Sequence, residues 1–439
     1  MAPTKDFNIA VVGGGIAGLT LAIALHHRGI PVKLYERASR FEEIGAGVSF
    51  TPNAVRAMEF CHPGVHEAFE KVCTRNSWPS KQEVWFDFVD GTKDEGAGFT
   101  INSSLGQNGV HRAHYLDELA KLFPEDQAVF GKCLDTITEN DGKVTMSFTD
   151  GTTATADAVI GCDGIKSRVR QLVVGLDHPS AHPTYSYKYA YRGMVPMEKA
   201  VEAVGEEKAR NATIHMGKGG HVLTFPVDHG RKLNIVAFRT SPTDWEDYSR
   251  TTSFASRQDA LRDFSGYGSA VTGLLRLTEE QLKVWAIFDL GDHPAPTFHK
   301  GRVCIAGDAA HATSPHHGAG AGFCIEDSAF LAELLSSVDS SRDLPSVFET
   351  FDDCRRERSQ WLVQSSRWIG NCYEWLADGI GSDMAKIESE INERNGIIAN
   401  FDLEGEVALA KGDLQKRLDH CYKLQRRALS WRGGFIKFT

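Results

Sequence analysis

The chain has 439 residues, 41% of them hydrophobic, and a formal net charge of −10. This length allows two or three domains, and the ordinary composition favours a soluble globular protein. The negative charge disfavours nucleic acid or an anionic membrane as the main partner, and no run of about 18 apolar residues predicts a membrane span. The nine cysteines form no Cys-x-x-Cys motif and no secretory signal pattern is present, so reduced thiols and a cytoplasmic location are expected.

The first predicted strand, 8–12, runs directly into a Gly-x-Gly-x-x-Gly turn that opens an apolar helix. In this turn Gly13 allows the tight bend, Gly15 lets the backbone approach a pyrophosphate, and Gly18 lets the helix pack closely on the strand. A second strand, 32–35, is followed by Glu36, whose carboxylate could accept hydrogen bonds from the hydroxyls of an adenosine ribose. The alternative is a glycine-rich turn in an ordinary α/β domain. Strand, helix and acid together predict a dinucleotide with an ADP half.

Further patterns follow in chain order. Residues 45–47 are glycine-rich, which suggests either backbone lying close to a ligand or a purely structural loop. A hairpin is expected over 81–100. A helix is predicted to begin at Arg112, and another strand–turn–helix pattern is centred on Asp163. Between about 180 and 290, short aromatic-rich segments alternate with polar turns, which is typical of a mostly antiparallel sheet. This segment reads as an insert into the Rossmann-like domain.

A buried strand then leads to Asp308, and a glycine run over 318–322 opens a helix. The rest is mainly helical, and we interpret its charged runs, including Arg355, Arg356 and Arg358, as solvated helix faces. The predicted fold class is therefore α/β with an α+β insert. The expected domains are a discontinuous Rossmann-like domain (1–80, 101–180 and 285–370), a sheet domain that binds substrate (81–100 and 181–284) and a C-terminal helical region (371–439).

Three patterns at strand ends stand in one order: Gly13, Gly15 and Gly18; Asp163-Gly164-x-x-Ser167-x-x-Arg170; and Gly307-Asp308-Ala309-Ala310-His311…Pro315. Over roughly residues 7–370 the chain thereby resembles the group A FAD-dependent aromatic monooxygenases of the para-hydroxybenzoate and salicylate hydroxylase type. A narrower resemblance is to fungal salicylate-hydroxylase-like enzymes that hydroxylate and dearomatise phenolic polyketides. The segments that carry it are 45–47, 191–193, 285–289 and 315–320.

The resemblance implies non-covalent FAD, with NADH or NADPH as a reductant that docks transiently because no second Rossmann unit is present. It implies that Asp308 holds the ribityl hydroxyls, that Arg112 lies near the cofactor, and that Asp163 shapes the pyrophosphate site. From the residues alone, Asp308 could instead cap its turn and Arg112 could be a surface arginine. The other FAD contacts that the resemblance implies are Gly13, Gly15, Gly18, Glu36, Arg37, Ala46, Gly47, Pro315, Gly318, Gly320 and Ala321.

The implied reaction begins when NAD(P)H reduces FAD. Dioxygen then adds at C4a, and the distal oxygen of the C4a-hydroperoxyflavin passes to an electron-rich phenol. A phenol attacks best as phenolate, yet its ordinary pKa is about 10, so a desolvated cation beside it is expected. We assign that role to Arg192, because a guanidinium stays charged when buried and offers two donors to an oxyanion. A strand arginine paired with a surface acid is the alternative.

Related dearomatising enzymes carry a tyrosine where this chain has Phe225, so Tyr115 is the candidate for a second phenolate contact, with core packing as its alternative. His316 and His317, beside the expected flavin edge, could relay protons or be structural. No metal site is expected, and the oligomeric state stays open. The expected substrate is an acyl-resorcinol-like phenol. The alternatives are a decarboxylating salicylate hydroxylase and a non-catalytic dinucleotide-binding sensor.

Overall fold

In the computed structural model the described residues are 5–41 and 47–433, with 424–433 described by their backbone alone. Ala46, an expected FAD contact, lies outside them. Within this part of the chain, no helix combines the length and the apolar character that crossing a membrane requires. The nine cysteines all fall inside it, and each is a free thiol.

A six-stranded sheet forms the Rossmann-like body, with the strand order β19-β20-β12-β1-β2-β8. β1 pairs in parallel with β2 and β12, so that Ile9 stands opposite Val32 and Ala158. All four residues of β1 are buried, as expected for a parallel strand that is covered on both faces. The strands are β1 (Ile9–Val12), β2 (Val32–Tyr35), β8 (Ala128–Val129), β12 (Ala158–Gly161), β19 (His299–Lys300) and β20 (Val303–Ile305).

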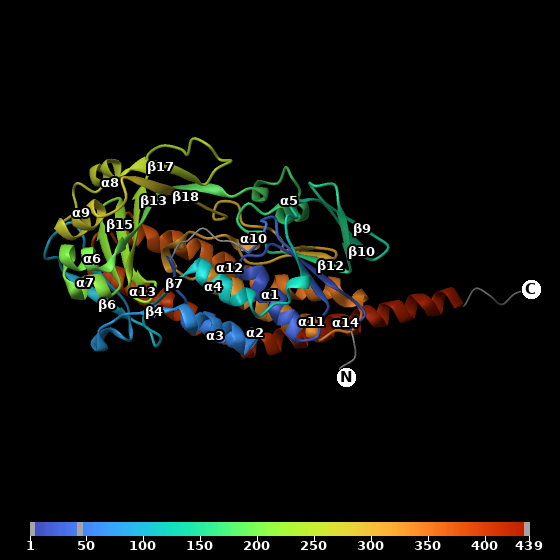
Figure 1. The fold of residues 1–439 in the computed structure, drawn as a ribbon. Coiled ribbons are helices and arrows are strands. Elements are labelled where there is room, and N and C mark those ends of the chain that lie inside the picture. Colours follow the sequence, from blue (N-terminus) through green and yellow to red (C-terminus); the bar gives the residue numbers. More distant parts are fainter. Residues whose placement is uncertain (1–4, 42–46, 434–439) are drawn as a thin grey trace, which may run out of the picture.

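Helices cover this sheet, and two small sheets complete the body. The helices are α1 (Ile16–His27), α2 (Pro52–Cys61), α3 (Pro63–Val72), α4 (Arg112–Ala120), α5 (Arg168–Val174), α10 (Asp308–His311), α11 (Gly320–Ser336) and α12 (Leu344–Tyr373). The small sheets are β3 (Gly47–Val48), β7 (Asn108–His111) and β4 (Thr74–Arg75), and β11 (Thr153–Ala156), β10 (Lys143–Phe148) and β9 (Leu134–Asn140). α13 (Met384–Ala399) and α14 (Leu403–Gly433) follow, and α14 projects away from the body (Figure 1). The predicted fold class, with its helical C-terminal region, is confirmed.

The second large sheet has eight strands, in the order β17-β18-β13-β16-β15-β14-β5-β6. It lies at the opposite end of the molecule from the β9–β10 ladder (Figure 1). All its pairings are antiparallel except that of β14 with β5. The expected boundary between 284 and 285 falls inside β18. The strands are β5 (Val84–Asp90), β6 (Gly98–Asn102), β13 (Thr184–Pro196), β14 (Thr213–Gly217), β15 (Gly220–Val227), β16 (Lys232–Thr240), β17 (Thr252–Ser256) and β18 (Gln281–Asp289).

The two faces of this sheet have different neighbours, because successive side chains of a strand point to opposite sides. Tyr191 belongs to a core shared with helices α6 (Met197–Val204), α7 (Glu206–Arg210), α8 (Arg257–Asp263) and α9 (Ser269–Arg276). Arg192 points to the other face. There Phe238, which pairs with Ala190, contacts the ring of His316 from the Rossmann-like body. This second face therefore meets the segment that opens α11.

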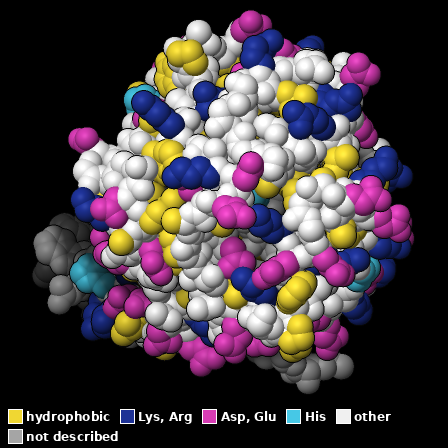
Figure 2. Space-filling view, turned by 90° about the vertical axis from the view of Figure 1, so that its left-hand side faces the viewer, with side chains coloured by type: hydrophobic (Ala, Val, Ile, Leu, Met, Phe, Trp, Pro, Cys, Tyr) yellow, Lys and Arg dark blue, Asp and Glu magenta, His cyan; other side chains and the backbone are white. Residues whose placement is uncertain are grey.

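Figure 2 shows the end of the molecule that carries the eight-stranded sheet. Acidic and basic side chains lie among one another on this face, and hydrophobic side chains form only small groups between them.

Candidate active site

The first glycine turn connects β1 to α1, and its three glycines differ in their surroundings. Gly13 has φ +107°, and a Cβ there would lie 2.3 Å from the carbonyl oxygen of Cys162. A Cβ on Gly18 would lie 1.9 Å from the oxygen of Gly13, so helix and turn touch directly. Among the described residues nothing lies within 4 Å of a Cβ at Gly15, and no side chain caps α1. The N–H groups of Gly13 and Gly14 already donate to Tyr35 and Glu36, so it is the uncapped start of α1, with its open space, that suits a phosphate group.

The carboxylate of Glu36 lies against this turn. It accepts hydrogen bonds from the backbone N–H groups of Gly14 (2.6 Å) and Ala38 (2.8 Å). The neighbouring Arg37 is exposed. The carboxylate predicted at the end of β2 therefore sits beside the glycine turn, although 22 residues separate it from Gly14.

The residues around Asp163 form hydrogen bonds that stabilise the fold of their own segment. Asp163 accepts from the hydroxyl of Ser167 and from the backbone N–H groups of Arg168 (2.7 Å) and Val169 (3.1 Å), which anchors the start of α5. Arg170 is fully buried, and its guanidinium donates to the carbonyl oxygen of Ala309 at 2.9 Å. The second motif thereby holds the third in place.

Asp308 follows β20 at its carboxyl end, where ligands bind in open α/β sheets. Its side chain is partly exposed, and no cation pairs with it among the described residues. The turn that carries it is fixed by Asp327 of α11, which accepts from the N–H of Gly307 (2.9 Å) and contacts Nε2 of His311 (2.6 Å). Burial raises the pKa of Asp327, but His311 and Arg355 outweigh burial and hold it at about 2.

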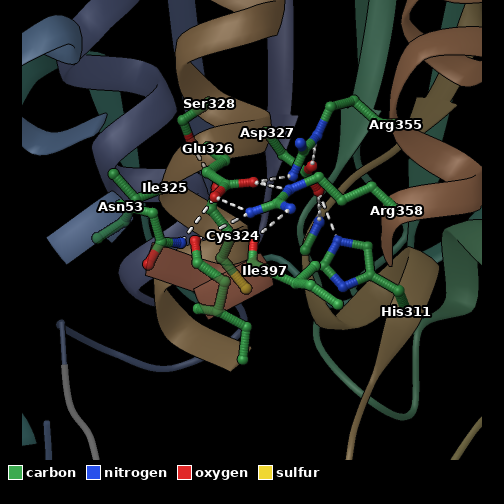
Figure 3. A network of polar contacts seen from close by, with 12 residues as sticks. Asn53, His311, Cys324, Ile325, Glu326, Asp327, Ser328, Arg355, Arg358 and Ile397 are labelled. Carbon is green, nitrogen blue, oxygen red and sulfur yellow. Dashed lines mark hydrogen bonds and ion pairs between the residues drawn. The ribbon is translucent and has the colours of Figure 1, made fainter. Parts of the chain in front are cut away.

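Figure 3 shows the buried ion-pair network that continues from Asp327. Arg355, Glu326 and Asp327 are each 0% exposed. Nε of Arg355 donates to Asp327 at 2.8 Å, and its Nη2 lies 2.7 Å from Glu326. Glu326 also accepts from Arg358 (2.9 Å) and from Asn53 (2.7 Å). The interpretation of Arg355 and Arg358 as solvated is wrong, since the facing helix α11 carries two carboxylates that pair with them.

The segment 315–321 opens α11. Pro315 begins a short 3-10 turn, Gly318 has φ +65°, and α11 starts at Gly320 without a side-chain cap. Ala321 in its first turn is partly buried. A Cβ on Gly318 would lie 3.7 Å from Trp85 of β5, so this turn adjoins the eight-stranded sheet. The helix therefore starts with uncapped amides close to that sheet.

Arg192 has an unusual environment. Its Nε and Nη1 are buried and have no hydrogen-bond partner among the described residues, and its guanidinium lies 4.8 Å from the ring centre of Trp285. Burial, and then the charge of Arg112, lower its pKa to about 10. The charge of Arg112, at the start of α4, therefore acts on the guanidinium of Arg192 from the sheet.

Phe225 lies on the same face of the sheet as Arg192. Arg192 pairs with Val236 and Phe225 pairs with Asn234, and these two partners are two residues apart on β16. Phe225 is 3% exposed. A Cβ on Gly47 would lie 2.6 Å from its ring, and one on Gly109 equally close. In this structure the close approach predicted at Gly47 is therefore to the ring of Phe225.

Tyr115 is not brought to this face. It is fully buried in the core of the Rossmann-like body, with its ring centre 5.5 Å from that of Phe50 and 6.5 Å from that of Phe69. Its hydroxyl lies 3.5 Å from the carbonyl oxygen of Val65. The expected second phenolate contact is thus corrected to core packing, because α4 turns this side chain toward α3.

The two neighbouring histidines point to different partners. Nδ1 of His316 lies 3.0 Å from the hydroxyl oxygen of Ser314, and its ring packs against Phe238. Nε2 of His317 lies 2.9 Å from the hydroxyl oxygen of Ser365 on α12. Burial lowers the pKa of both, to about 3 for His317. Burial therefore favours the neutral form of both side chains.

A buried cluster behind His316 has no motif in the sequence. Glu374, just after α12, pairs with Lys188 of β13 and lies 3.2 Å from Nδ1 of His221. The side chains of His221, His316 and Glu374 approach one another closely enough to reach one cation, but Lys188 already supplies a positive charge to Glu374. The sequence shows only that Lys188 stands between two tyrosines in a strand rich in aromatic residues.

Comparison with known proteins places these features in a family. The FAD binding domain family matches residues 6–366. The chain is 45% identical to an FAD-dependent monooxygenase of Aspergillus niger, over 91% of this chain and 95% of that protein. It is 46% identical to an FAD-dependent monooxygenase of Monascus ruber, over 94% of this chain and 98% of that protein.

Among solved structures, a salicylate hydroxylase in a substrate complex matches with a TM-score of 0.83 and 35% identity, over 92% of this chain and 98% of that one. A family of named monooxygenases excludes the non-catalytic sensor as an account of the chain. The glycine turn, the uncapped start of α11 and the Asp308 carboxylate, which has no ion-pair partner among the described residues, fit an FAD molecule. The chain belongs to the FAD binding domain family and is an FAD-dependent monooxygenase.

Proposed function

We propose that this enzyme hydroxylates a phenolic, acyl-resorcinol-like substrate derived from a polyketide, with dearomatisation of the ring. NADH or NADPH supplies the electrons and dioxygen supplies the oxygen atom. The observation that carries the proposal is the largely buried guanidinium of Arg192, whose Nε and Nη1 have no hydrogen-bond partner among the described residues, together with the nearby charge of Arg112. A buried cation without a carboxylate partner favours an anionic ligand.

The parts of the FAD molecule would be held by separate turns of the chain. Gly13, Gly15 and Gly18 would hold the pyrophosphate, and Glu36 the adenosine ribose. Asp308 would hold the ribityl hydroxyls, as its unpaired, partly exposed carboxylate allows. The amides of 318–321 would face the isoalloxazine, where a helix N-terminus stabilises negative charge. The activation of dioxygen would be supplied by FAD when it is bound and reduced, and the side chains of this chain would hold and orient the substrate.

Arg192 has the task of keeping the substrate deprotonated. Lowering the pKa of a phenol from about 10 to about 7 requires ~4 kcal/mol of differential stabilisation. A charge-assisted hydrogen bond in a desolvated site contributes on the order of 2–3 kcal/mol, and the charge of Arg112 adds to it. The ring of Trp285 covers the guanidinium and limits the access of water to it, which strengthens both effects.

Arg192→Met tests the proposal. Loss of this donor should lower kcat/KM by at least about 100-fold, leave the FAD content unchanged and return the pKa of the bound phenol toward that of the free phenol. Arg239→Met is the matched control, because Arg239 lies on the neighbouring strand β16 but in register with Tyr189, whose hydroxyl donates to Asp263 on the opposite face. Equal kinetics for both variants would remove Arg192 from the mechanism.

A decarboxylating salicylate hydroxylase is the second candidate. The likeness to a solved salicylate hydroxylase favours it, and two adjacent guanidinium groups could bind a carboxylate as well as a phenolate. Release of carbon dioxide from salicylate, measured together with NAD(P)H consumption, separates it from hydroxylation of acyl resorcinols.

A further inference from the structure

A second buried donor lies on the sheet face that carries Arg192. Asn234 of β16 is 2% exposed, and its Nδ2 has no hydrogen-bond partner among the described residues. It stands opposite Met194 of β13 and Phe225 of β15, so its direct cross-strand neighbours are apolar. Its amide carbon lies 3.2 Å from where a Cβ on Gly47 would be, at the junction with the Rossmann-like body.

An unsatisfied amide at this position requires an explanation. In native proteins nearly all buried side-chain donors have a hydrogen-bond partner, because an unpaired donor loses its hydration without a compensating hydrogen bond. No shape requirement calls for asparagine between a methionine and a phenylalanine, where leucine would fill a similar volume. A ligand that brings an acceptor into the site would satisfy the amide.

The ladder register fixes the relation between Asn234 and Arg192. Arg192 pairs with Val236, two residues beyond Asn234 on the same strand. Diagonal neighbours of this kind have Cβ atoms about 7–8 Å apart on one face. Two donor side chains at that spacing can contact two oxygens of one substituted ring. Met194 and Phe225 offer no acceptor, so the oxygen near Asn234 is best a carbonyl, which carries no hydrogen of its own.

We infer that Asn234 is a specificity-determining residue that donates a hydrogen bond to the acyl carbonyl oxygen of the substrate while Arg192 holds the phenolate oxygen. This inference rests on the proposed function. It implies that the enzyme recognises the acyl group of the substrate in addition to the phenol. Alkyl phenols without the carbonyl leave the amide unpaired and bind more weakly for that reason.

The experiment compares two ligands on the oxidised holoenzyme: an acyl resorcinol, and the alkyl resorcinol of the same chain length. Dissociation constants come from the change in flavin absorbance without any reductant, so turnover is not needed. Asn234→Ala should weaken binding of the acyl ligand about 10-fold and change binding of the alkyl ligand less than 2-fold. Asn234→Leu, which has no donor and a similar volume, should show the same selective loss and serves if the alanine variant does not retain FAD.

Asn211→Ala is the matched control. Asn211 is equally buried, but its Nδ2 donates to the carbonyl oxygen of Glu207 at 2.7 Å, so both ligands should bind as in the wild type. An equal loss for both ligands in the Asn234 variants, or no loss for either, overturns the inference and leaves the role of Arg192 standing. Failure of the wild-type enzyme to bind either phenol would instead overturn the proposed function itself.

Discussion

Replacing Asp327 with asparagine tests whether the buried network positions the cofactor turn. The two carboxylate oxygens serve three groups: the N–H of Gly307, Nε2 of His311 and Nε of Arg355. An asparagine keeps one acceptor and turns an NH2 group toward at least one of these donors. Removing one partner from a buried ion pair costs ~3–5 kcal/mol, a large share of a typical unfolding free energy of ~5–15 kcal/mol.

Urea unfolding of the apoprotein measures this loss, and titration with FAD measures the effect on the turn before Asp308. We expect the unfolding midpoint to fall and FAD to bind more weakly. Asp413→Asn is the control, because within the described part of the chain this exposed carboxylate pairs with the neighbouring Lys416 alone, and the change should leave both measurements unchanged. A loss below ~1 kcal/mol with unchanged FAD affinity would refute the reasoning.

Acid should reveal the same group in the wild-type protein. The pKa of Asp327 is lowered to about 2, so its stabilisation is complete above its ordinary pKa near 4 and is lost as the pH falls from there toward 2. The Asp327→Asn variant should lack this component between pH 4 and 2. Equal acid sensitivity of the two proteins would contradict the assignment.

Three further predictions concern single sites. Gly15→Ala should fold normally, because a Cβ has open space there, but should bind FAD at least about 10-fold more weakly. Gly18→Ala should fail to fold, because its Cβ would meet the oxygen of Gly13. Flavin absorbance after purification distinguishes the two variants. Burial lowers the pKa of His317 to about 3. The free energy of unfolding should therefore decrease as the pH falls from about 6.5 toward 3, by up to ~1.4 kcal/mol per pH unit. His317→Gln should reduce this pH dependence, measured as urea unfolding midpoints. Tyr115→Phe should retain substrate affinity and rate in steady-state assays, since its hydroxyl faces Val65.

The sequence alone was sufficient for the features that depend on neighbouring residues. The β1–α1 glycine turn requires a positive φ at Gly13 and a missing Cβ at Gly18, and these constraints act within a few residues. The start of α4 at Arg112, the α/β class and the antiparallel insert follow from periodicity in the same way. Such local signals are readable because each residue meets its constraint inside its own segment.

The partners of charged and polar side chains depend on tertiary packing. Arg355 looks like part of a solvated helix face in the sequence and is fully buried, since α11 brings Glu326 and Asp327 against it. Tyr115 lies three residues after Arg112 yet points into the core, while Asn234, which belongs to no motif, faces the site. The sequence by itself determined which segments form turns, helices and strands. Only the packing of distant segments decided which charges are paired and which donors have no partner, because burial and pairing depend on two surfaces that meet.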